Sequence, residues 1–566
     1  MKFILKYSKY NLLFSASLGL ILIPIAIYYY TVYHFAINIP FWDEYYAALD
    51  WVGIYITKEF PENLLHTFKQ ANEHRIFTYY VTVLTEYILL GKVNFRYLMI
   101  FGNMAMLGLL YVLLKLRNER SNNLFAFLPV VLLLFAPQQE ITNWGIMTYN
   151  GILEYFLVFA SLLFLNKEGK LNLSIAVFFA AVATFSFGNG MFVFIAGFII
   201  LYLKKPNPKV KISIWAAFML ICVYLYFIDY LTIDSGFSKL EILHQPLQGL
   251  LFFLTIFGSL FTPWARGIIE LHYLYGFILL SCFVCLILFK WKYLIKNPLF
   301  LSLFTFLFLS AFAATLSRVG VGVGAATAPR YVILPALFSA LMYITYLNSI
   351  NGTRKGVFFM IIALSVLLYV TRLNESLIRF DNHKNKLTEG LFSYYTNRDS
   401  TTLQYQYPNQ AATILDNAIK GGYFTPPKIS QLNLKVGLLE NISLIADSND
   451  ILYRIDKKED QPLFFQMKGW TILKENNNSN QQIVVILKSE TKSYVFSTQT
   501  LSRMDVLAHF KDSYPSVNES EYCGFNFILD KNGYSILPQT YRVGIGITFE
   551  GEMKAIKFSS IYVDFK

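Results

Sequence analysis

The stretch NLLFSASLGLILIPIAIYYYTVY, residues 11–33, decides the fold class of this chain. It contains no charged residue and is long enough to cross the ~30 Å hydrocarbon core of a bilayer as a helix, which needs roughly 20 apolar residues. Lys2, Lys6 and Lys9 precede it, as they would in a signal peptide. The run is too long for a signal peptide, however, and no small-residue cleavage site follows it. We therefore expect a retained membrane helix.

The composition of the whole chain also indicates a membrane protein. Its 566 residues are 55% hydrophobic and 17% aromatic, and the mean hydropathy is positive. Long apolar blocks continue to about Tyr369, whereas the remainder is rich in Asn, Asp, Ser and Lys. We therefore predict a transmembrane domain (1–372), a helical linker segment (373–432) and a soluble domain (433–566). The four cysteines give no disulfide framework.

Eleven apolar segments have lengths that suit membrane helices, either spanning alone or bundled inside protein. They are residues 11–33, 94–116, 123–137, 150–166, 172–187, 190–203, 212–232, 270–290, 298–316, 330–348 and 356–371. Two further apolar stretches, 77–90 and 250–263, are short. Counting either one as a span would move all later basic clusters to the other side, so we expect both to be interfacial or re-entrant.

Basic residues give the orientation. Clusters between the spans fall on the side of the N-terminal lysines, which the positive-inside rule makes cytoplasmic. They are Arg117 and Arg120; Lys167 and Lys170; Lys204, Lys205, Lys209 and Lys211; Lys290, Lys292 and Lys296; and Arg354 and Lys355. The net charge of +12 is thus mostly topological, and we expect no nucleic-acid partner. Eleven spans place the C-terminal domain outside the cytoplasm.

The first external loop carries two adjacent carboxylates, Asp43 and Glu44, in the sequence FWDEYY. A carboxylate near the membrane surface and partly against apolar protein has a raised pKa, so it could act as a general base. The pair could also bind a divalent cation, Mg²⁺ or Mn²⁺, through oxygen, although no cofactor is certain. The alternative is a solvated pair inside an interfacial aromatic belt.

Cations gather in two other external segments. His74 and Arg75 lie in NEHRIFTYY, and Arg318, Arg330 and Tyr331 lie in SRVGVGVGAATAPRY. The guanidinium fork of arginine matches phosphate oxygens, and two fixed cations beside the bilayer suit a lipid-linked phosphate. We therefore predict that these five residues bind the phosphate of a donor. The alternative is that the cations snorkel to lipid headgroups.

The external segment 137–151 supplies further polar and aromatic side chains. Glu140, Asn143 and Trp144 could provide hydrogen bonds and a stacking face for a sugar. The soluble domain shows alternating runs such as QIVVILKS and YRVGIGITF between Asn, Gly, Asp and Ser turns, which predicts an antiparallel β-sandwich. Its Trp470 is expected in the core.

Several of these motifs together resemble a known superfamily. The acidic pair in FWDEYY, the loop end NEHRIFTYY, the many-span bundle and the late external SRVGVGVGAATAPRY resemble bacterial GT-C membrane glycosyltransferases. In the tail, MKGW, LSRMDVLAHF, YCGFNFIL and YRVGIGI look like a small β-sandwich appended to some of these enzymes. The resemblance covers most of the chain in architecture but only these short motifs in sequence.

The resemblance implies a hexosyl- or pentosyltransferase of the bacterial cytoplasmic (inner) membrane. Such enzymes take a sugar from a polyprenyl-phosphate donor to a cell-surface glycan, such as lipopolysaccharide, or to another lipid-linked acceptor. A first-loop acidic residue serves there as base or metal ligand, which maps onto Asp43 with Glu44 as helper. The pattern here is DE rather than DxD, which puts a metal requirement in doubt.

Two other classes of membrane protein stay open. A polymerase or ligase of lipid-linked glycans would share the topology and the arginines but use a diphosphate donor. A transporter or flippase should show ionisable residues buried in mid-span or repeated halves; the spans here carry few ionisable residues, Glu154 being an exception, and we see no clear repeat.

Overall fold

The structure is a computed structural model of the chain, and it divides into two compact units, Met1–Thr425 and Pro426–Lys566. It describes all residues except 1, 118–123, 205–208, 233–240, 266, 350–354, 399, 428–435, 439–447, 463, 475–480, 511–512, 514–522, 532–535, 550–551 and 566. Arg120, Lys205 and Arg354 of the predicted basic clusters, and part of the predicted linker, thus lie outside the described residues.

Long apolar helices dominate the first unit. Nine segments of the described chain are long and apolar enough to cross a membrane: Ser15–Phe35, Phe95–Lys115, Gly145–Leu165, Lys209–Phe227, Pro246–Ala265, Ile269–Lys296, Pro298–Val321, Pro329–Ser349 and Gly356–Thr388. Four shorter apolar segments accompany them: Phe77–Leu90, Leu124–Leu134, Lys170–Ser186 and Gly188–Leu203. The prediction of a helical region with many apolar helices of membrane-spanning length is therefore confirmed.

Each of the eleven predicted spans overlaps a described helix. These helices are α1 (Lys2–Phe35), α5 (Phe95–Asn103) with α6 (Ala105–Lys115), α7 (Leu128–Leu134), α10 (Glu154–Leu165), α11 (Lys170–Ser186), α12 (Phe192–Leu203), α13 (Lys209–Phe227), α17 (Ile269–Lys296), α18 (Pro298–Arg318), α19 (Ile333–Ser349) and α20 (Lys355–Asn397). At 1.5 Å per residue, α7, α11 and α12 are shorter than a ~30 Å bilayer core. The count of eleven crossings therefore stays a prediction.

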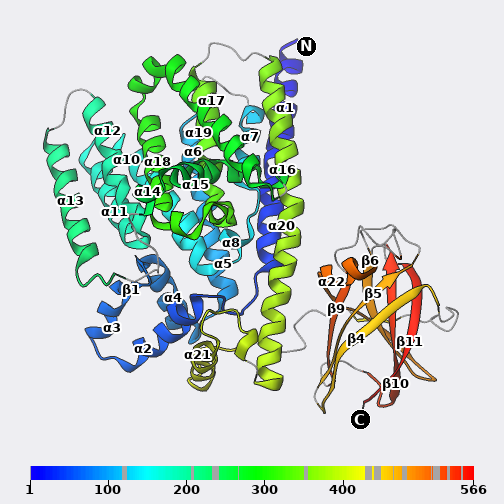
Figure 1. Cartoon of the computed structure of the whole chain (residues 1–566). Coiled ribbons are helices and arrows are strands. Elements are labelled where there is room, and N and C mark those ends of the chain that lie inside the picture. The colour runs from blue at the N-terminus through cyan, green and yellow to red at the C-terminus, as the bar shows by residue number, and fades with distance from the viewer. Residues whose placement is uncertain are drawn as a thin grey trace. The chain divides into compact units, whose positions relative to one another are not determined.

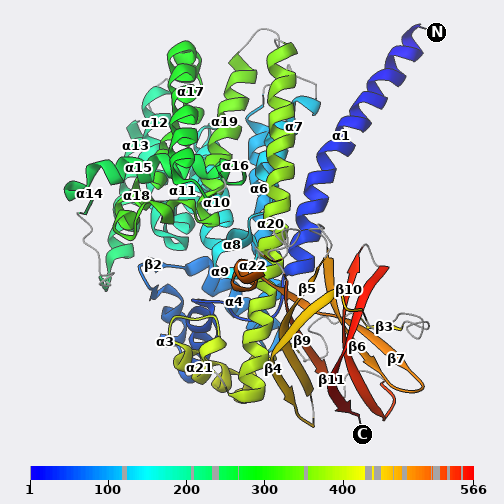
Figure 2. The ribbon, with the colours of Figure 1, turned by 45° about the vertical axis from the view of Figure 1, so that its right-hand side comes forward.

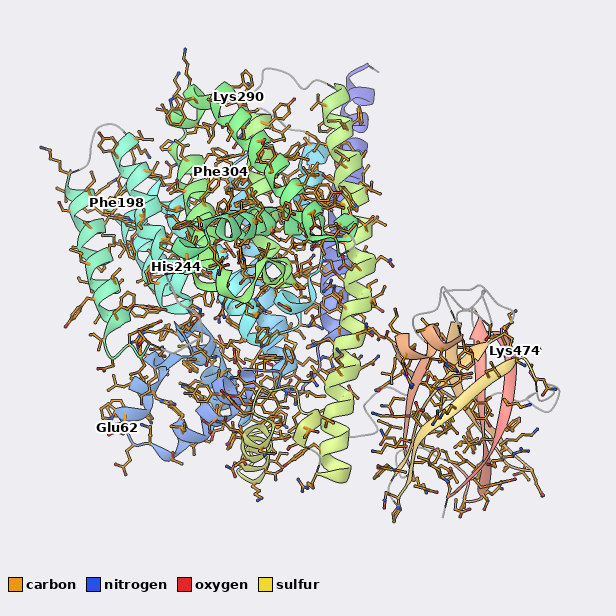
Figure 3. The ribbon with its side chains drawn as sticks, viewed as in Figure 1. Glu62, Phe198, His244, Lys290, Phe304 and Lys474 are labelled. Atoms are coloured by element: carbon orange, nitrogen blue, oxygen red, sulfur yellow. The ribbon has the colours of Figure 1, made fainter. Side chains whose placement is uncertain are left out.

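The turns of the first unit gather at two opposite ends of the helix bundle. At one end, Asn348 donates to the Leu116 carbonyl over 2.8 Å, and Lys290 donates to the Ser349 carbonyl over 3.3 Å. The N-terminal end of α1 and Lys290 lie at this end, while Glu62 of the first loop lies at the other (Figures 1 and 3). The basic clusters that the structure describes thus share one end, as the sequence predicts.

The predicted first external loop folds as a layer of short elements at the opposite end of the bundle. A π-helical turn (Tyr45–Asp50) leads into α2 (Trp51–Thr57) and α3 (Glu62–Leu65). A short hairpin of β1 (Gln70–Ala71) and β2 (His74–Arg75) follows. Helix α4 (Phe77–Leu90) ends the layer, with the left-handed Gly91 closing its last turn. Helices α3 and α4 lie away from the N-terminal end of α1 in both Figure 1 and Figure 2.

The stretch predicted to be re-entrant forms an interrupted hairpin with α17. Its helices are α14 (Glu241–His244), α15 (Pro246–Gly258) and α16 (Thr262–Ala265), with a 3-10 turn at Ser259–Phe261. Pro246–Ala265 is long and apolar enough to span, yet α15 itself is about 20 Å long at 1.5 Å per residue. The buried Arg372 of α20 donates to the carbonyls of Ser259 and Leu260, so it satisfies the backbone groups that this break frees.

The structure has no helix break at the predicted boundary, residue 372. Helix α20 continues without a break from Lys355 to Asn397, and the first unit runs on through α21 (Pro408–Lys420) to Thr425. Beyond the apolar part of α20, Phe380, Leu387, Leu391 and Tyr394 are buried at intervals of three to seven residues, which keeps one face of the helix packed on protein. A prediction from hydropathy alone ends the helix where its other face becomes polar.

The second unit is built from antiparallel sheets (Figure 2). Its strands are β3 (Val436–Leu438), β4 (Ile451–Asp460), β5 (Phe464–Leu473), β6 (Gln481–Lys488), β7 (Ser493–Ser497), β8 (Gln499–Leu501), β9 (Gly524–Asp530), β10 (Thr540–Phe549) and β11 (Glu552–Asp564), with the short helix α22 (Met504–Phe510). One sheet has the order β11-β10-β6-β7-β3 and the other β4-β5-β9-β8. Side chains of both sheets, among them Phe465, Phe527, Val485 and Ile545, form one buried hydrophobic cluster.

Candidate active site

The candidate site lies at the loop end of the first unit, where four segments that are distant in sequence meet. They are the turn around Asp43, the β1–β2 hairpin, the segment with α8 (Gln139–Thr142) and α9 (Gly145–Met147), and the glycine-rich segment 318–331. Two ion pairs join them. Arg318 contacts Glu73 at 3.5 Å, and Arg330 contacts Glu140 at 3.1 Å.

Asp43 lies at the centre of this group. The preceding residue Trp42 has φ of 47°, a left-handed backbone that is uncommon for a bulky side chain and occurs at tight, functionally constrained turns. Burial raises the pKa of Asp43 above its usual value, while a hydrogen bond from the Asn72 side chain and the charges of Arg318 and Arg330 oppose that shift. Asp43 is thus a half-buried carboxylate within electrostatic reach of both predicted arginines.

Glu44 points away from that environment and is fully buried. Its Oε2 accepts a hydrogen bond from the Phe41 amide at 2.9 Å, and its Oε1 accepts from the Ile146 amide at 3.3 Å and the Tyr79 hydroxyl at 3.5 Å. Burial raises the pKa of Glu44 to about 8, although these donors oppose the rise. The two adjacent carboxylates therefore have different surroundings, and Glu44 ties the first loop to α9.

Arg318 and Arg330 each keep part of their guanidinium accessible. Their side chains are 43% and 36% exposed, and each meets its carboxylate through one nitrogen. A guanidinium has five N–H donors in a planar fork, so further donors remain for an anion. Tyr331 lies under the Arg330 guanidinium at 5.4 Å from the ring centre, which holds the cation in place.

His74 and Arg75 have different surroundings from each other. The His74 ring packs on Phe187 at 4.1 Å, and burial together with the charge of Arg318 lowers the His74 pKa to about 4, so this imidazole is neutral near pH 7. Arg75 is buried and donates to the carbonyls of Phe68, Tyr226 and Ile228. Its donors are occupied by backbone oxygens, an arrangement that favours a structural tie between the first loop and α13 over a phosphate contact.

Asn143 and Trp144, predicted to contact a sugar, are buried in the structure. Trp144 is 8% exposed and packs edge-on against Phe41 at 5.1 Å. Within the described part of the chain, the Trp144 indole nitrogen and the Asn143 Oδ1 have no hydrogen-bond partner. The ring of Trp144 therefore offers no open face for stacking, whereas Glu140 stays half-buried beside Arg330.

The sequence did not identify three residues that the structure places at the site. Asn72 begins the motif NEHRIFTYY, but its contact with Asp43 involves a left-handed backbone, φ 48°, that no sequence pattern reveals. Glu73 pairs with Arg318 across a sequence separation of 245 residues. Tyr405 interacts electrostatically with Asp43 and comes from a polar stretch that carries no motif.

The pair Asp43 and Glu44 does not fit a shared metal site. Both oxygens of Glu44 already accept hydrogen bonds inside the protein. Across the residues that the structure describes, no three His, Cys, Asp or Glu side chains gather to hold a metal ion.

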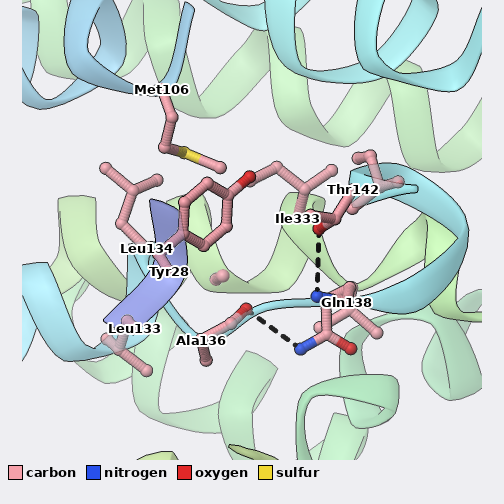
Figure 4. A pocket seen from close by; sticks show the side chains of 11 residues that line it. Tyr28, Met106, Leu133, Leu134, Ala136, Gln138, Thr142 and Ile333 are labelled. Atoms are coloured by element: carbon pink, nitrogen blue, oxygen red, sulfur yellow. Dashed lines mark hydrogen bonds between the residues drawn. The ribbon is translucent and has the colours of Figure 1, made fainter. Parts of the chain in front are cut away.

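A small cavity lies against α8, on side chains other than the charged residues of the site. Its lining is mostly apolar, with Tyr28, Met106 and Ile333 around it and Gln138 and Thr142 at one side (Figure 4). Gln138 donates from its backbone to Thr142 Oγ1 and from its side chain to the Ala136 carbonyl, each over 3.2 Å. These polar groups are satisfied locally, so the cavity offers no chemistry of its own.

Comparisons with protein-family models, with curated proteins and with solved structures return no match for this chain. The superfamily resemblance therefore stays a hypothesis that rests on the motifs and on the site geometry.

Proposed function

We propose that this chain is a membrane glycosyltransferase that moves a sugar from a polyprenyl-phosphate donor to an extracytoplasmic acceptor, a surface glycan or a lipid-linked saccharide. One observation carries the proposal. Asp43 lies within electrostatic reach of Arg318 and Arg330, which come from the far end of the membrane domain in sequence. A half-buried carboxylate facing two arginines at the end of a helix bundle suits a base beside a phosphate leaving group.

The reaction uses Asp43 as general base. Its carboxylate takes the proton of an acceptor hydroxyl, and the hydroxyl oxygen attacks the anomeric carbon of the donor sugar. The bond from that carbon to the phosphate oxygen breaks, and the lipid phosphate leaves with the electron pair. Burial raises the Asp43 pKa, which strengthens it as a base while the arginines keep it ionised.

The arginines stabilise the leaving phosphate. Negative charge grows on the phosphate oxygen as the bond breaks, and fixed N–H donors lower the energy of that transition state most where water is scarce. Glu73 and Glu140 orient the two guanidinium groups before the donor binds. Glu44, which has no exposed surface, is assigned a positioning role in place of a direct catalytic one.

We further propose the topology that the chemistry requires. Eleven crossings with the basic end in the cytoplasm place Asp43 and the second unit outside, where a flipped lipid-linked donor is available. We interpret the two antiparallel sheets of the second unit as a β-sandwich, since their inward side chains share one cluster.

The test is a transfer assay with purified protein in liposomes. We expect radiolabel from a polyprenyl-monophosphate sugar to appear on an added glycan acceptor. Label that only crosses the bilayer would support a flippase, and transfer that occurs only from a diphosphate-linked donor would support a polymerase or ligase. Either result would contradict the proposal.

A further inference from the structure

We propose that four aromatic residues at the loop end, Trp42, Tyr46, Tyr405 and Tyr407, form an acceptor-binding wall that holds a sugar ring of the acceptor against Asp43. The inference rests on the proposed function, because it assigns the side of Asp43 from which the acceptor hydroxyl arrives. It names a site contributed by the chain after the last membrane helix, a part that the sequence presents as a linker.

The chain after α20 turns back and docks on the first loop. The Trp42 amide donates to the Gln404 carbonyl over 2.8 Å. The Tyr405 ring lies 5.7 Å from that of Tyr45, and Tyr423 contacts Gly53 through its hydroxyl. Segments separated by more than 350 residues in sequence thus build one surface, which holds Tyr405 in a defined place.

Tyr405 lies beside the proposed base. Asp43 and Tyr405 each directly follow one partner of the hydrogen bond from the Trp42 amide to the Gln404 carbonyl, which brings the two side chains close in space. In agreement, burial and the nearby charges of Asp43 and Asp50 raise the pKa of Tyr405. The Tyr407 ring meets Tyr405 edge-on with ring centres 5.9 Å apart. The wall therefore begins next to Asp43 and extends outward along the 400–407 segment.

Three of the four side chains of the wall are exposed. Tyr407 is 58% exposed, Trp42 is 43% exposed and Tyr46 is 37% exposed. Grouped exposed aromatic residues mark binding surfaces more often than isolated ones do. The left-handed backbone at Trp42, which fixes where this ring projects, is the kind of strain that proteins retain at functional sites.

Chemistry favours a saccharide over a lipid surface as the occupant. An aromatic ring offers an apolar face for the C–H side of a sugar, and the tyrosine hydroxyls can exchange hydrogen bonds with sugar hydroxyls. Asp50, whose charge acts on Tyr405 of the wall, would repel anionic headgroups. A neutral sugar meets no such penalty, and its hydroxyl reaches the carboxylate that must deprotonate it.

The test measures glycan binding without the lipid donor, so that it does not depend on transfer. Full-length protein in detergent is probed with an array of fluorescently labelled neutral oligosaccharides prepared from bacterial surface glycans. The variants are Tyr405→Ala, which removes the ring, and Tyr405→Phe, which keeps it. The control is Tyr202→Ala, which removes a 74% exposed tyrosine from α12 at the basic end of the bundle.

We expect the wild type to bind at least one oligosaccharide, and Tyr405→Ala to weaken that binding by at least about fivefold, as loss of an aromatic anchor does. Tyr405→Phe and Tyr202→Ala should bind within about twofold of the wild type, because the ring supplies most of the contact. Failure to bind any oligosaccharide, or equal binding by Tyr405→Ala, would overturn the inference. If oligosaccharide binding behaves as expected but the protein transfers no sugar in the liposome assay, the proposed reaction is wrong and the assignment of the wall as a sugar-binding site is kept.

Discussion

Adjacent carboxylates acquire different roles through their surroundings. Asp43 is half-buried and faces cations, while Glu44 is sealed inside and accepts backbone hydrogen bonds. The sequence FWDEYY identifies the pair but cannot separate its members, because neighbouring side chains at the start of a helical turn point about 100° apart. Which one faces the site depends on α9, some 100 residues later.

The separate role of Glu44 predicts a pH effect on stability. Burial raises its pKa from 4.5 to about 8, so between these values the folded protein binds a proton that the unfolded protein does not. The free energy of unfolding should therefore fall as the pH rises from about 4.5 to 8 and level off above 8. His66 and His74, whose pKa values fall to about 4, change stability only below about pH 6.5.

Thermal unfolding in detergent at pH 7, 8 and 9 checks this. The melting temperature of the wild type should decrease mainly between pH 7 and 8, and Glu44→Gln should remove most of the decrease, whatever its melting temperature at pH 7. Equal slopes in the two proteins would show that Glu44 is not the titrating group.

The two arginines predict a donor-specific defect. Arg318→Ala or Arg330→Ala removes charge-assisted hydrogen bonds to phosphate, each worth about 1.5–3 kcal/mol, and should raise the donor KM by roughly 10- to 100-fold. Acceptor KM should change little. Arg379→Ala is the matched control, since Arg379 is an exposed arginine that pairs with Glu375 on α20. Unchanged donor KM in both site variants would contradict their assignment.

At the scale of elements, the apolar runs of the sequence predict helices and strands, but they do not predict where these elements end or how they are connected. Every predicted span overlaps a helix, and the runs QIVVILKS and YRVGIGITF became β6 and β10. Strand β4 carries no comparable apolar run, because it ends in the charged sequence KKED and lies at the edge of its sheet. The predicted span 356–371 ends before α20 does, because the last part of this helix is amphipathic. The segment after α20 was therefore interpreted as a linker, and Tyr405 within it was not considered as a site residue.

The α15–α17 hairpin depends on glycine at its crossing. A Cβ at Gly276 would overlap the Leu254 carbonyl oxygen, and one at Gly258 would overlap the carbonyl oxygen of His272. Small residues allow membrane helices to approach this closely. Gly276→Ala should therefore cost about 1–3 kcal/mol through overpacking and lower the melting temperature.

Gly19→Ala serves as the control for this substitution. Gly19 also lies in an apolar helix, α1, but no atom lies within 4 Å of the added Cβ. If Gly276→Ala has the same melting temperature as Gly19→Ala and the wild type, the close crossing of α15 and α17 is wrong.

At the scale of the whole molecule, the proposed chemistry depends on which ends of the first unit carry the basic clusters and the Asp43 group. The first unit carries its described basic turns at one end and the Asp43 group at the other. Lysine patterning predicts such a separation, because charge near span ends is a local signal, and the side of the membrane to which each end belongs stays a prediction. The sequence motifs led us to expect Asp43, Arg318 and Arg330 in one site, whereas the arrival of Tyr405 beside them could not be predicted, because it depends on packing between segments that are distant in sequence.

A reporter that is active only outside the cytoplasm tests this sidedness. Fused after Thr425, where the first unit ends, it should be active. Fused after Lys204, at the basic end of α12, it should be inactive. The reverse pattern would place Asp43 in the cytoplasm and exclude a donor presented on the outer leaflet.

The most direct test of the central claim is single-turnover sugar transfer by Asp43→Asn, with Glu62→Gln as the control. Glu62 is a carboxylate of the same loop whose side chain is 74% exposed. Loss of a general base should slow transfer by about 10²- to 10⁴-fold while donor affinity stays near that of the wild type, and Glu62→Gln should transfer normally. Transfer by Asp43→Asn at the wild-type rate would contradict the assignment of Asp43 as the base.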